Sequence, residues 1–569
     1  MDYEILFNDV SFQYAGSEEP AIRNINLSIP TGEIVLITGP AGSGKTTLCS
    51  CINGLIPHYH EGKLSGKVLV GTYNTKNVQV GGLASLVGMV FQDPESQLVT
   101  NSVADEVAFG PENLGVPREE IIQRLKEALK ETRLKGYDDR EPHTLSEGEK
   151  QACVIAATYA MHPEIYVMDE PLANLDPIGR AQVLRLVIEV AKERVKTLVI
   201  VEHALEEVLP FVDRVIIMDQ GEIIRDGSLE DVISDGDIKN VFKRPDVIRL
   251  AEEFNIKPFS LKPEEFYKAL NTKYKLGSLN TAMHRTKQNC SGEAVIEMKN
   301  VTHCYIPGKE TLHDINLTIQ SGEFVAILGR NGSGKTTLVS HIIGLLHPDE
   351  GTVTVVDKDV STTPTYELAK DVGFCFQNPN HQIVSFNVHD EMAFGLKAHS
   401  IDPSEFKTRI QEALEVVNMQ GYIDAEVFDL GKGQKQRIAL ASVLTLKPRI
   451  LIIDEPTTGQ DPEMTDDIFQ IIRQLNKQGT TVLIITHKMD YAAMFAERAI
   501  VLQQGRLAYD GPIQELIMNI DLMHENSLDL PDITKLARLL SEKGVPSNTV
   551  KFDDMKVFIN QLVEESYGN

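Results

Sequence analysis

The chain has 569 residues, which is too long for one hydrophobic core and predicts several domains. Hydrophobic residues make up 42% and charged residues 24%, a balance that excludes collagen-like, mucin-like and wholly disordered chains. The 82 acidic residues outnumber the 55 lysines and arginines, and a net charge of -27 excludes general attraction to nucleic-acid phosphates or anionic lipid as the main binding mode.

The sequence shows no secretory signal and no apolar run of the roughly 18 residues that span a bilayer. Its six cysteines include no CxxC pair, which excludes a disulfide framework and a zinc ribbon. The histidines of Pro57-His58-Tyr59-His60 have no further ligand nearby, so we interpret them as part of a solvated loop. We therefore expect a reduced, cytoplasmic protein.

Short apolar strands alternate along the chain with helical patterns. The strand-like runs at residues 34–38, 166–168 and 197–201 are rich in β-branched and apolar side chains, and apolar residues at 119–130 have helical spacing. This alternation is typical of a mostly parallel sheet covered by helices, so we expect an α/β fold.

The chain repeats itself once. The glycine-rich segment Gly39–Thr47 returns as Gly329–Thr337, an offset of 290 residues (335 − 45 at the lysines). Later landmarks recur at offsets of 284 to 285: Gln92 and Gln377, Asp169 and Asp454, Glu170 and Glu455, His203 and His487. Repeats at a fixed offset indicate duplicated structural units. We predict two α/β cores in tandem.

Composition suggests where each unit ends. A hairpin-like run at residues 215–224 closes the first core, a polar stretch follows at 280–292, and the segments 245–251 and 531–537 resemble each other. The predicted domains are a nucleotide-binding unit at 1–231, a helical appendage at 232–279, a linker at 280–292, a second nucleotide-binding unit at 293–514 and a second appendage at 515–569. Each appendage could bind an effector, steady the two halves or cap its core, and we favour a structural role.

Each glycine-rich segment follows a buried strand and precedes a helix, the context that a phosphate-binding loop requires. Backbone N–H groups of such a loop bind phosphate at a helix N-terminus, the lysine reaches the β- and γ-phosphates, and the hydroxyl after it binds Mg²⁺. Lys45 and Thr46 take these roles in the first half, and Lys335 and Thr336 in the second. The predicted loop residues are Gly39, Pro40, Ala41, Gly42, Ser43, Gly44, Lys45, Thr46, Thr47, Gly329, Arg330, Asn331, Gly332, Ser333, Gly334, Lys335, Thr336 and Thr337.

Two adjacent carboxylates end a later apolar strand of each half. Asp169 and Asp454 are predicted to hold Mg²⁺ through water, and the next residues, Glu170 and Glu455, to orient and deprotonate an attacking water. The alternative is that these carboxylates cap the following helix. His203 and His487 each end the next strand and could hydrogen-bond a γ-phosphate, or serve the structure alone. The sequence thus predicts an ATPase that uses ATP and Mg²⁺.

These motifs, in this order and repeated over almost the whole chain, resemble those of ATP-binding-cassette (ABC) ATPases. The resemblance implies P-loop NTPase domains with a mostly parallel core, an antiparallel β subdomain and a helical signature subdomain. It also implies that two units pack head to tail, so that each ATP lies between one P-loop and the other unit's signature segment. Further positions carried over are the adenine-stacking Tyr14 and Tyr305, the Mg²⁺- and γ-phosphate-sensing Gln92 and Gln377, and the signature residues Ser146, Gly148, Gly431 and Gly433.

Neither half has the intact family signature, LSGGQ. The first reads LSEGE at Leu145–Glu149 and keeps the hydroxyl of Ser146, whereas the second reads LGKGQ at Leu430–Gln434 and has Gly431 there. In a head-to-tail pair, the nucleotide of Lys45 faces Gly431. We expect unequal sites, with the Lys335–Glu455–Ser146 site carrying most turnover.

The segments after the two glutamines carry a finer resemblance, to the ATPase components of energy-coupling-factor (ECF) importers. Phe91–Leu98 precedes Val103–Gly115 in the first half, and residues 376–383 precede 388–395 in the second. The resemblance implies an integral membrane T component, whose coupling-helix arginine contacts an acidic residue, and a separate S component that binds a vitamin or transition-metal ion. The candidate acidic residues are Asp105, Glu106, Asp390 and Glu391. Alternatively, these residues only favour the start of a helix.

This interpretation places the chain at the cytoplasmic face of the cell membrane as a peripheral protein, in contact with the membrane through its partners. A soluble tandem ABC ATPase acting on ribosomes or DNA is the alternative, and an ordinary ABC importer or exporter ATPase is a third. Only 124 residues (169 − 45) separate Lys45 from Asp169, which leaves no room for a long coiled-coil insertion, and zinc-binding cysteines are missing. We expect no nucleic-acid partner.

Overall fold

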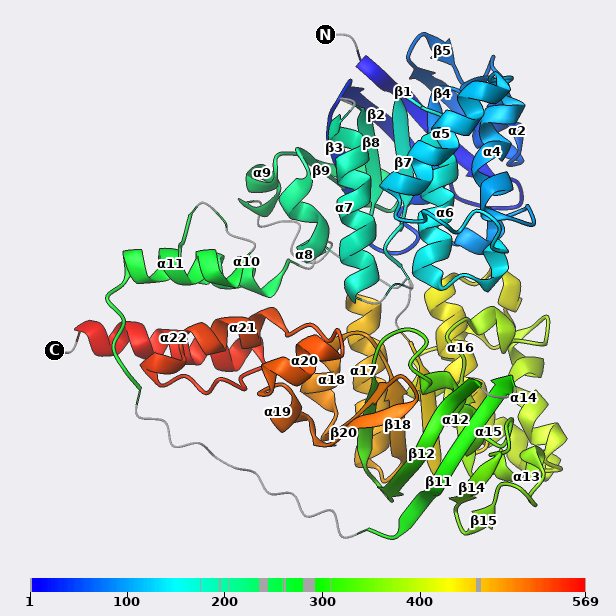
Figure 1. The fold of residues 1–569 in the computed structure, drawn as a ribbon, viewed down its shortest axis with the longest axis vertical. Helices are drawn as coiled ribbons and strands as arrows, with labels where there is room; N and C mark the ends of the chain where they lie inside the picture. The colour runs from blue at the N-terminus through cyan, green and yellow to red at the C-terminus, as the bar shows by residue number, and fades with distance from the viewer. Residues whose placement is uncertain are drawn as a thin grey trace. The chain divides into compact units, whose positions relative to one another are not determined.

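The computed structural model describes residues 3–567 except 174, 176, 194–195, 204, 235–243, 258, 260–261, 280–291, 307–308 and 457–461. The predicted linker at 280–292 therefore lies outside the described residues apart from Gly292. The chain divides into two compact units, Met1–Arg249 and Leu250–Asn569. Each contains a four-stranded antiparallel sheet and a six-stranded, mainly parallel sheet (Figure 1).

The antiparallel sheet of the first unit has the strand order β2-β1-β4-β5. Its strands are β1 (Tyr3–Tyr14), β2 (Ile22–Pro30), β4 (Gly62–Val70) and β5 (Tyr73–Asn74). Along β1, Ile5 and Phe7 and, beyond an irregularity in the pairing, Val10 and Phe12 are buried in one core with the first of the parallel strands.

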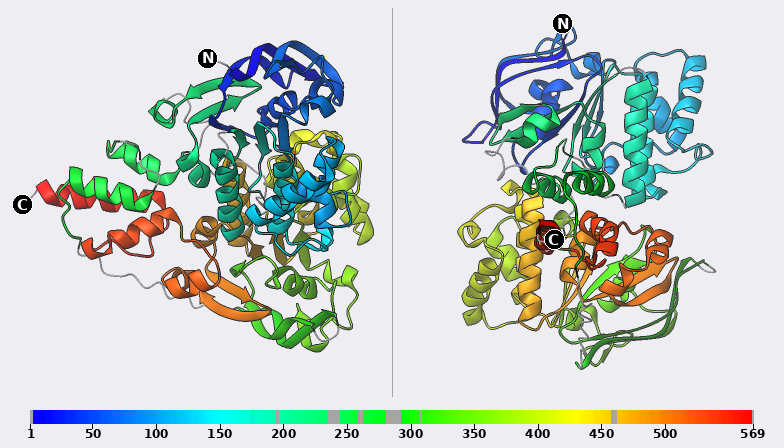
Figure 2. Two further views of the ribbon diagram at one scale, coloured as in Figure 1. Left: turned by 45° about the horizontal axis from the view of Figure 1, so that its top comes forward. Right: turned by 90° about the vertical axis from the view of Figure 1, so that its left-hand side faces the viewer.

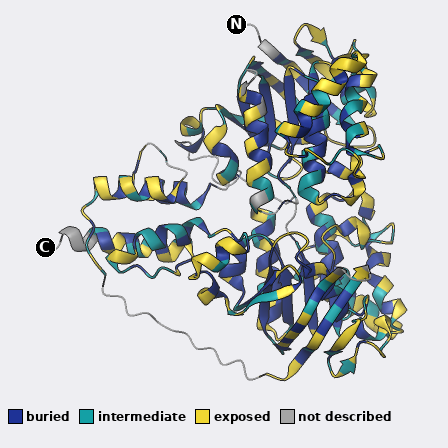
Figure 3. Ribbon diagram, viewed as in Figure 1, coloured by how far each residue is buried: buried dark blue, intermediate teal, exposed yellow. Residues whose placement is uncertain are grey.

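The six-stranded sheet of the first unit has the order β10-β9-β3-β8-β7-β6, with β10 antiparallel to β9 and the others parallel. Its strands are β3 (Ile34–Thr38), β6 (Val87–Val90), β7 (Ile165–Asp169), β8 (Thr197–Val201), β9 (Arg214–Asp219) and β10 (Glu222–Gly227). Every residue of β3, β7 and β8 is buried, as expected for parallel strands covered on both faces (Figure 3).

The helices of the first unit are α1 (Lys45–Ile52), α2 (Leu55–His58), α3 (Val80–Leu83), α4 (Val103–Asn113), α5 (Arg118–Glu131), α6 (Glu147–Ala160), α7 (Pro177–Glu193), α8 (Leu205–Val208), α9 (Leu229–Ser234) and the start of α10 (Asp246–Glu253). Helices α4, α5 and α6 pack on one another and form a helical subdomain. The long helix α7 lies along the parallel sheet of its unit (Figure 2).

The second unit repeats this plan, with sheets ordered β12-β11-β14-β15 and β16-β17-β18-β13-β19-β20. Its strands are β11 (Ala294–Ile306), β12 (Lys309–Gln320), β13 (Phe324–Leu328), β14 (Glu350–Val355), β15 (Lys358–Asp359), β16 (Val372–Cys375), β17 (Ile450–Asp454), β18 (Thr481–Ile485), β19 (Arg498–Gln503) and β20 (Arg506–Pro512). Its helices are α12 (Lys335–Ile342), α13 (Thr365–Leu368), α14 (Val388–Ala398), α15 (Pro403–Val416), α16 (Lys432–Leu444), α17 (Pro462–Lys477) and α18 (Met489–Phe495). The predicted tandem α/β fold is confirmed.

Helices follow the β20 hairpin of the second unit: α19 (Ile513–Leu516), α20 (Ile520–Glu525), α21 (Asp532–Leu539) and α22 (Phe552–Tyr567). They are joined by α11 (Pro263–Lys273), which comes from the segment between the two cores and packs against α21 (Figure 1). The amides of Gly277 and Leu279 donate to the carbonyls of Leu562 and Lys543 at 2.8 and 2.7 Å. The predicted boundaries at residues 231, 279 and 514 stay predictions.

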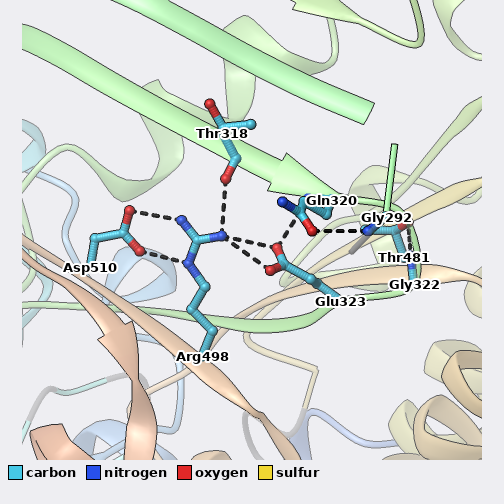
Figure 4. A network of polar contacts seen from close by, with 8 residues as sticks. All are labelled: Gly292, Thr318, Gln320, Gly322, Glu323, Thr481, Arg498 and Asp510. Atoms are coloured by element: carbon cyan, nitrogen blue, oxygen red, sulfur yellow. Dashed lines mark hydrogen bonds and ion pairs between the residues drawn. The ribbon is translucent and has the colours of Figure 1, made fainter. Parts of the chain in front are cut away.

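An arginine joins the two sheets of each half. In the second unit, Arg498 donates to both carboxylate oxygens of Asp510 (2.6 and 2.8 Å), to Glu323 (3.0 Å) and to the carbonyl of Thr318 in β12 (2.9 Å; Figure 4). Arg214 makes the same contacts in the first unit, with Asp226, Glu33 and the carbonyl of Ser28. Because guanidinium geometry matches these acceptors, this contact fixes the antiparallel sheet on the parallel core.

We predict that Arg498→Ala lowers the free energy of unfolding by about 2 kcal/mol, or roughly 4–8 °C in the unfolding midpoint, because it leaves a mostly buried Glu323 carboxylate without its partner. Thermal unfolding followed by circular dichroism measures this change. Arg506→Ala, which truncates an exposed arginine of the neighbouring strand β20, is the control and should leave the midpoint within 1–2 °C. Equal effects of the two changes would contradict the role given to Arg498.

Candidate active sites

Each phosphate-binding loop depends on glycines with backbone conformations that other residues rarely adopt. Gly39 has φ +143° and Gly329 has φ +137°. A Cβ atom at Gly39 would lie 2.0 Å from the carbonyl oxygen of Met218, and one at Gly329 would lie 2.3 Å from that of Leu502. Only glycine allows the loop to approach β9 and β19 this closely.

The loop lysines are almost fully buried, with 6% of Lys45 and 7% of Lys335 exposed. The ammonium group of Lys45 donates to the carbonyls of Gly39 (3.0 Å) and Pro40 (2.7 Å), and that of Lys335 donates to Gly329 (2.8 Å) and Arg330 (2.9 Å). Each helix that follows, α1 or α12, begins at its lysine. Charged ammonium and helix N-terminus therefore converge on the same loop, which suits a phosphate group.

A buried aspartate ends β7 and β17 beside each loop. Burial raises the pKa of Asp169 to about 6, although a hydrogen bond from Thr46 and the charge of Lys45 oppose this shift. Burial also raises the pKa of Asp454 to about 6, against the charge of Lys335. Among the residues that the structure describes, Oδ1 of Asp169 is buried without a hydrogen-bond partner. An orphaned carboxylate oxygen beside a threonine hydroxyl fits a hard cation such as Mg²⁺.

The next residue in each half is a glutamate in the left-handed region, with φ +49° at Glu170 and +43° at Glu455. The amide of Glu170 donates to the carbonyl of Val201 in β8, and that of Glu455 donates to Ile485 in β18, both at 2.9 Å. Because this conformation is costly for a residue with a side chain, its occurrence at both copies indicates that the direction of the glutamate side chain matters.

In the first half, the structure brings together three of the predicted residues. The side-chain amide of Gln92 donates to Oε2 of Glu170 at 2.6 Å, and Nε2 of His203 lies 3.3 Å from Oε1. The second half differs. Nε2 of His487 lies 3.3 Å from Oε1 of Glu455 and 2.9 Å from Oδ1 of Asn331, and Gln377 is exposed.

The two predicted adenine-stacking tyrosines lie at matching places. The hydroxyl of Tyr14 is 3.2 Å from Oγ1 of Thr47, and that of Tyr305 is 3.3 Å from Oγ1 of Thr337. The strand that carries each tyrosine is therefore joined to the helix after its P-loop, and Tyr305 is 58% exposed. The stacking role stays a prediction.

The two signature segments begin helices α6 and α16. Ser146 is the N-cap of α6 and exchanges hydrogen bonds with Glu149 in a capping box, whereas Gly431 caps α16 without a side chain. Gly433 is packed so that a Cβ atom would lie 2.4 Å from the sulfur of Met464, whereas Gly148 has space around it. Their contact with nucleotide stays a prediction.

The first signature also carries an acidic residue in place of the family's glycine. Oε1 of Glu147 lies 2.9 Å from Nζ of Lys150, whose buried side chain also pairs with Glu95. Lys150 therefore neutralises Glu147 locally, and it joins the segment that follows Gln92 to the signature helix. In the second half, Lys435 instead lies over the ring of Phe428 at 5.7 Å.

The acidic pairs at the starts of α4 and α14 divide into an exposed and a buried member. Oε2 of Glu106 accepts the amides of Val99 and Thr100 at 3.0 and 2.9 Å. Glu391 does the same for Val384 and Ser385, and these two glutamates are only 5% and 3% exposed. The prediction that they offer a contact to a partner's arginine is wrong, because both carboxylates are used to hold the preceding loop.

Asp105 and Asp390, in contrast, are exposed. Each lies one turn before an exposed phenylalanine on the same helix, Phe109 (49% exposed) and Phe394 (56%). Residues four apart lie on one helix face. The two helices therefore present a carboxylate and an aromatic ring side by side.

Glu202, which directly follows β8 and is 3% exposed, is not among the residues predicted from the sequence. Its oxygens accept the amides of Leu172 at 2.7 Å and His203 at 3.1 Å. Burial and the nearby Glu170 raise its pKa to about 8. The signal that pointed to Asp169, a charged residue at the end of an apolar strand, also marks this position.

A pH dependence of stability follows from Glu202. Its pKa is higher in the folded chain than the ordinary value of 4.5, so the folded state holds the proton more tightly and loses stability as pH rises from about 5 to 8. One such group contributes at most about 1.4 kcal/mol per pH unit.

We predict that Glu202→Gln unfolds at increasingly higher temperature than the unsubstituted chain as pH rises from 6 to 8.5, because glutamine does not ionise. Melting curves at several pH values measure this difference. Glu222→Gln, at an exposed position of the same unit, should show a constant difference. A difference for Glu202→Gln that does not change with pH would contradict the assignment.

No described helix is both long and apolar enough to cross a membrane, and no cluster of three or more His, Cys, Asp or Glu side chains suited to a metal ion occurs in the described part of the chain. The family model described as ABC transporter matches residues 22–173 and 312–458, which contain both P-loops and both strand-end carboxylate pairs. This chain belongs to the ABC transporter ATPase family.

Other members of the ABC family match along nearly their whole length. A protein of Caldanaerobacter subterraneus subsp. tengcongensis is 39% identical over 95% of this chain and 97% of its own, and one from Methanosarcina mazei is 37% identical over 95% of each. Both are named as putative ABC transporter ATP-binding proteins. A solved structure of cbiO1 from Clostridium perfringens, described as part of the ABC transporter complex cbiONQ, is 30% identical, covers 43% of this chain and 99% of its own, and has a TM-score of 0.39.

Proposed function

We propose that this ABC protein is the ATP-hydrolysing, energy-coupling subunit of a membrane importer of the ECF type. The proposal rests on the duplicated arrangement of P-loop lysine, buried aspartate, strained glutamate and histidine, which each half combines with a helix that presents an aspartate and a phenylalanine. The lysine, the two acidic residues and the histidine support ATP hydrolysis. The exposed aspartate and phenylalanine of the helix support a helical membrane partner.

The residues of each half divide the chemistry among them. Lys45 and the amides of its loop bind the β- and γ-phosphates. Thr46 and Asp169, with Gln92, would hold Mg²⁺, which would neutralise charge that develops on the phosphate oxygens. Glu170 orients a water and accepts its proton as the oxygen attacks the γ-phosphorus, and the bond to the β-phosphate oxygen breaks to leave ADP. The corresponding group in the second half consists of Lys335, Thr336, Asp454, Gln377, Glu455 and His487.

His203 is placed to assist Glu170. Its ring contacts the glutamate carboxylate, so it orients this base in the absence of a γ-phosphate and can turn to donate to the phosphate when ATP binds. The proposed composite arrangement, in which the Lys45 nucleotide meets Gly431 and the Lys335 nucleotide meets Ser146, makes the two sites unequal. Loss of one hydrogen bond to a charged phosphate costs about 1.5–3 kcal/mol, which slows hydrolysis roughly ten- to a hundredfold.

We predict that Glu455→Gln lowers ATP turnover at least about tenfold, whereas Glu170→Gln lowers it less than about twofold, because the Lys335 site retains the serine hydroxyl. Phosphate release by the purified full-length chain measures both, and the double variant should lose turnover completely. Equal losses in the two single variants would contradict the unequal sites. Undiminished turnover in the double variant would contradict ATP hydrolysis by these residues.

The membrane partner in this proposal is a T component, with a separate S component that binds the transported vitamin or metal ion. A coupling helix that carries an arginine fits the exposed faces of α4 and α14, because Asp105 and Asp390 supply the carboxylates and Phe109 and Phe394 the apolar contacts. The chain would then act at the cytoplasmic face of the membrane as a peripheral protein.

We predict that Asp105→Asn combined with Asp390→Asn releases the chain from membranes of its source cell, reducing the bound fraction about five- to tenfold in a sedimentation assay. Glu119→Gln combined with Glu405→Gln removes two exposed carboxylates of the adjoining helices and should change the bound fraction less than twofold. Equal retention of both double variants would contradict the docking role of the aspartates.

A further inference from the structure

One buried carboxyl group beside the first active site has no part in the proposed chemistry. Glu202 follows β8, is 3% exposed, and uses both oxygens as acceptors of backbone amides. A buried carboxyl group is costly unless its hydrogen bonds are specific. The position of Glu202 and its two hydrogen bonds therefore indicate that this carboxyl group has a specific role.

The two amides belong to the two segments that carry the reacting side chains. Leu172 lies two residues after Glu170 in the turn that follows β7, and its N–H donates to Oε1 of Glu202 at 2.7 Å. His203 donates its own backbone N–H to Oε2 at 3.1 Å. The carboxyl group thus joins the turn of the catalytic glutamate to the loop of the histidine, whose Nε2 is 3.3 Å from Oε1 of Glu170.

The second half has a different residue at this position, and Thr457, its counterpart of Leu172, lies outside the described residues. Thr486 occupies the position of Glu202, is fully buried, and accepts the amide of Lys488 at 3.1 Å. The amide of His487 lies 3.4 Å from Oε2 of Glu455 itself, at the long end of hydrogen-bond distances. In the first half, the corresponding amide of His203 donates to Glu202 instead, and the Glu170 carboxylate contacts Gln92 and the His203 ring.

The charges around Glu202 permit this role without adding repulsion to the site. The charged groups that act on it are Glu170 after β7 and Glu207 on α8, and Glu207 pairs with Arg180 of α7 at 3.3 Å. Burial, reinforced by Glu170, raises the pKa of Glu202 to about 8. Near neutral pH the group is therefore mostly uncharged, and it ionises only as pH rises past this value.

We propose that Glu202 is a positioning residue of the first active site, holding the Glu170 turn and the His203 loop in one arrangement through the amides of Leu172 and His203. The proposal rests on the proposed ATP hydrolysis for its effect on turnover. The link itself can be tested without turnover.

Hydrogen–deuterium exchange of the full-length chain tests the link directly. Glu202→Thr, which installs the residue of the second half, should speed exchange of the Leu172 and His203 amides at least fivefold and leave the amides of Leu328 and His487 within twofold. Glu202→Gln keeps one carbonyl acceptor, so exchange of the Leu172 and His203 amides in this variant should be faster than in the unsubstituted chain and slower than in Glu202→Thr. Unchanged exchange at Leu172 and His203 in Glu202→Thr would overturn the proposal.

Turnover separates positioning from a merely structural role. In a Glu455→Gln background, where the first site supplies the remaining hydrolysis, Glu202→Thr should lower kcat five- to twentyfold and change KM for ATP less than twofold, and Glu202→Gln should retain most of kcat. In this Glu455→Gln background, kcat should fall above about pH 8 when Glu202 is present and stay constant when Glu202→Gln is added. In a Glu170→Gln background, Glu202→Thr should have no effect.

The outcomes distinguish the two proposals. A chain that hydrolyses no ATP contradicts the proposed function. In that case the exchange measurement still tests whether Glu202 holds the amides of Leu172 and His203. A chain that hydrolyses ATP but shows equal kcat and pH profile with Glu202 and Glu202→Thr overturns the positioning role. Thr486→Glu is the matched control, and it should leave exchange at Leu172 unchanged.

Discussion

The burial of parallel strands whose carboxyl ends carry charged residues determines where the reacting side chains of both halves lie. Strands β3, β7 and β8, and β13, β17 and β18, are buried throughout, so they bring the P-loop, the aspartate–glutamate pair and the histidine of each half to one sheet edge. Two buried carboxylates with raised pKa values are costly to the fold. Their presence in both halves indicates that some stability was given up for a site suited to a cation and phosphate.

The duplicated halves share a scaffold and differ at the reacting groups. The arginine that joins the two sheets, the glycine φ angles and the left-handed glutamates repeat almost unchanged. The surroundings of the glutamates do not repeat, because Glu202 stands where the second half has Thr486 and Ala41 stands where it has Asn331. The signature residues differ as well. Two sites built on one plan can therefore divide the tasks of binding and hydrolysis between them.

The sequence was sufficient for the fold class and for the residues with the strictest local requirements. The P-loops could be predicted because glycine, lysine and threonine must follow a buried strand at fixed spacing. The strand-end carboxylates could be predicted because acidic residues rarely end an apolar run. The burial of Glu106 and Glu391 could not be predicted, because an acidic residue near a helix start has the same pattern whether it faces solvent or holds a loop. The packing of α11 on α21 could not be predicted either, since it joins segments more than 250 residues apart in the sequence (532 − 273 = 259).

We propose that this ABC ATPase works as part of a membrane complex. Affinity purification of the tagged full-length chain from detergent-solubilised membranes of its source, with mass spectrometry of every co-purifying protein, tests it most directly. We expect one polytopic membrane protein and a second, smaller membrane protein in stable proportion to the chain. Recovery of ribosomal or DNA-bound proteins without any membrane protein would contradict it.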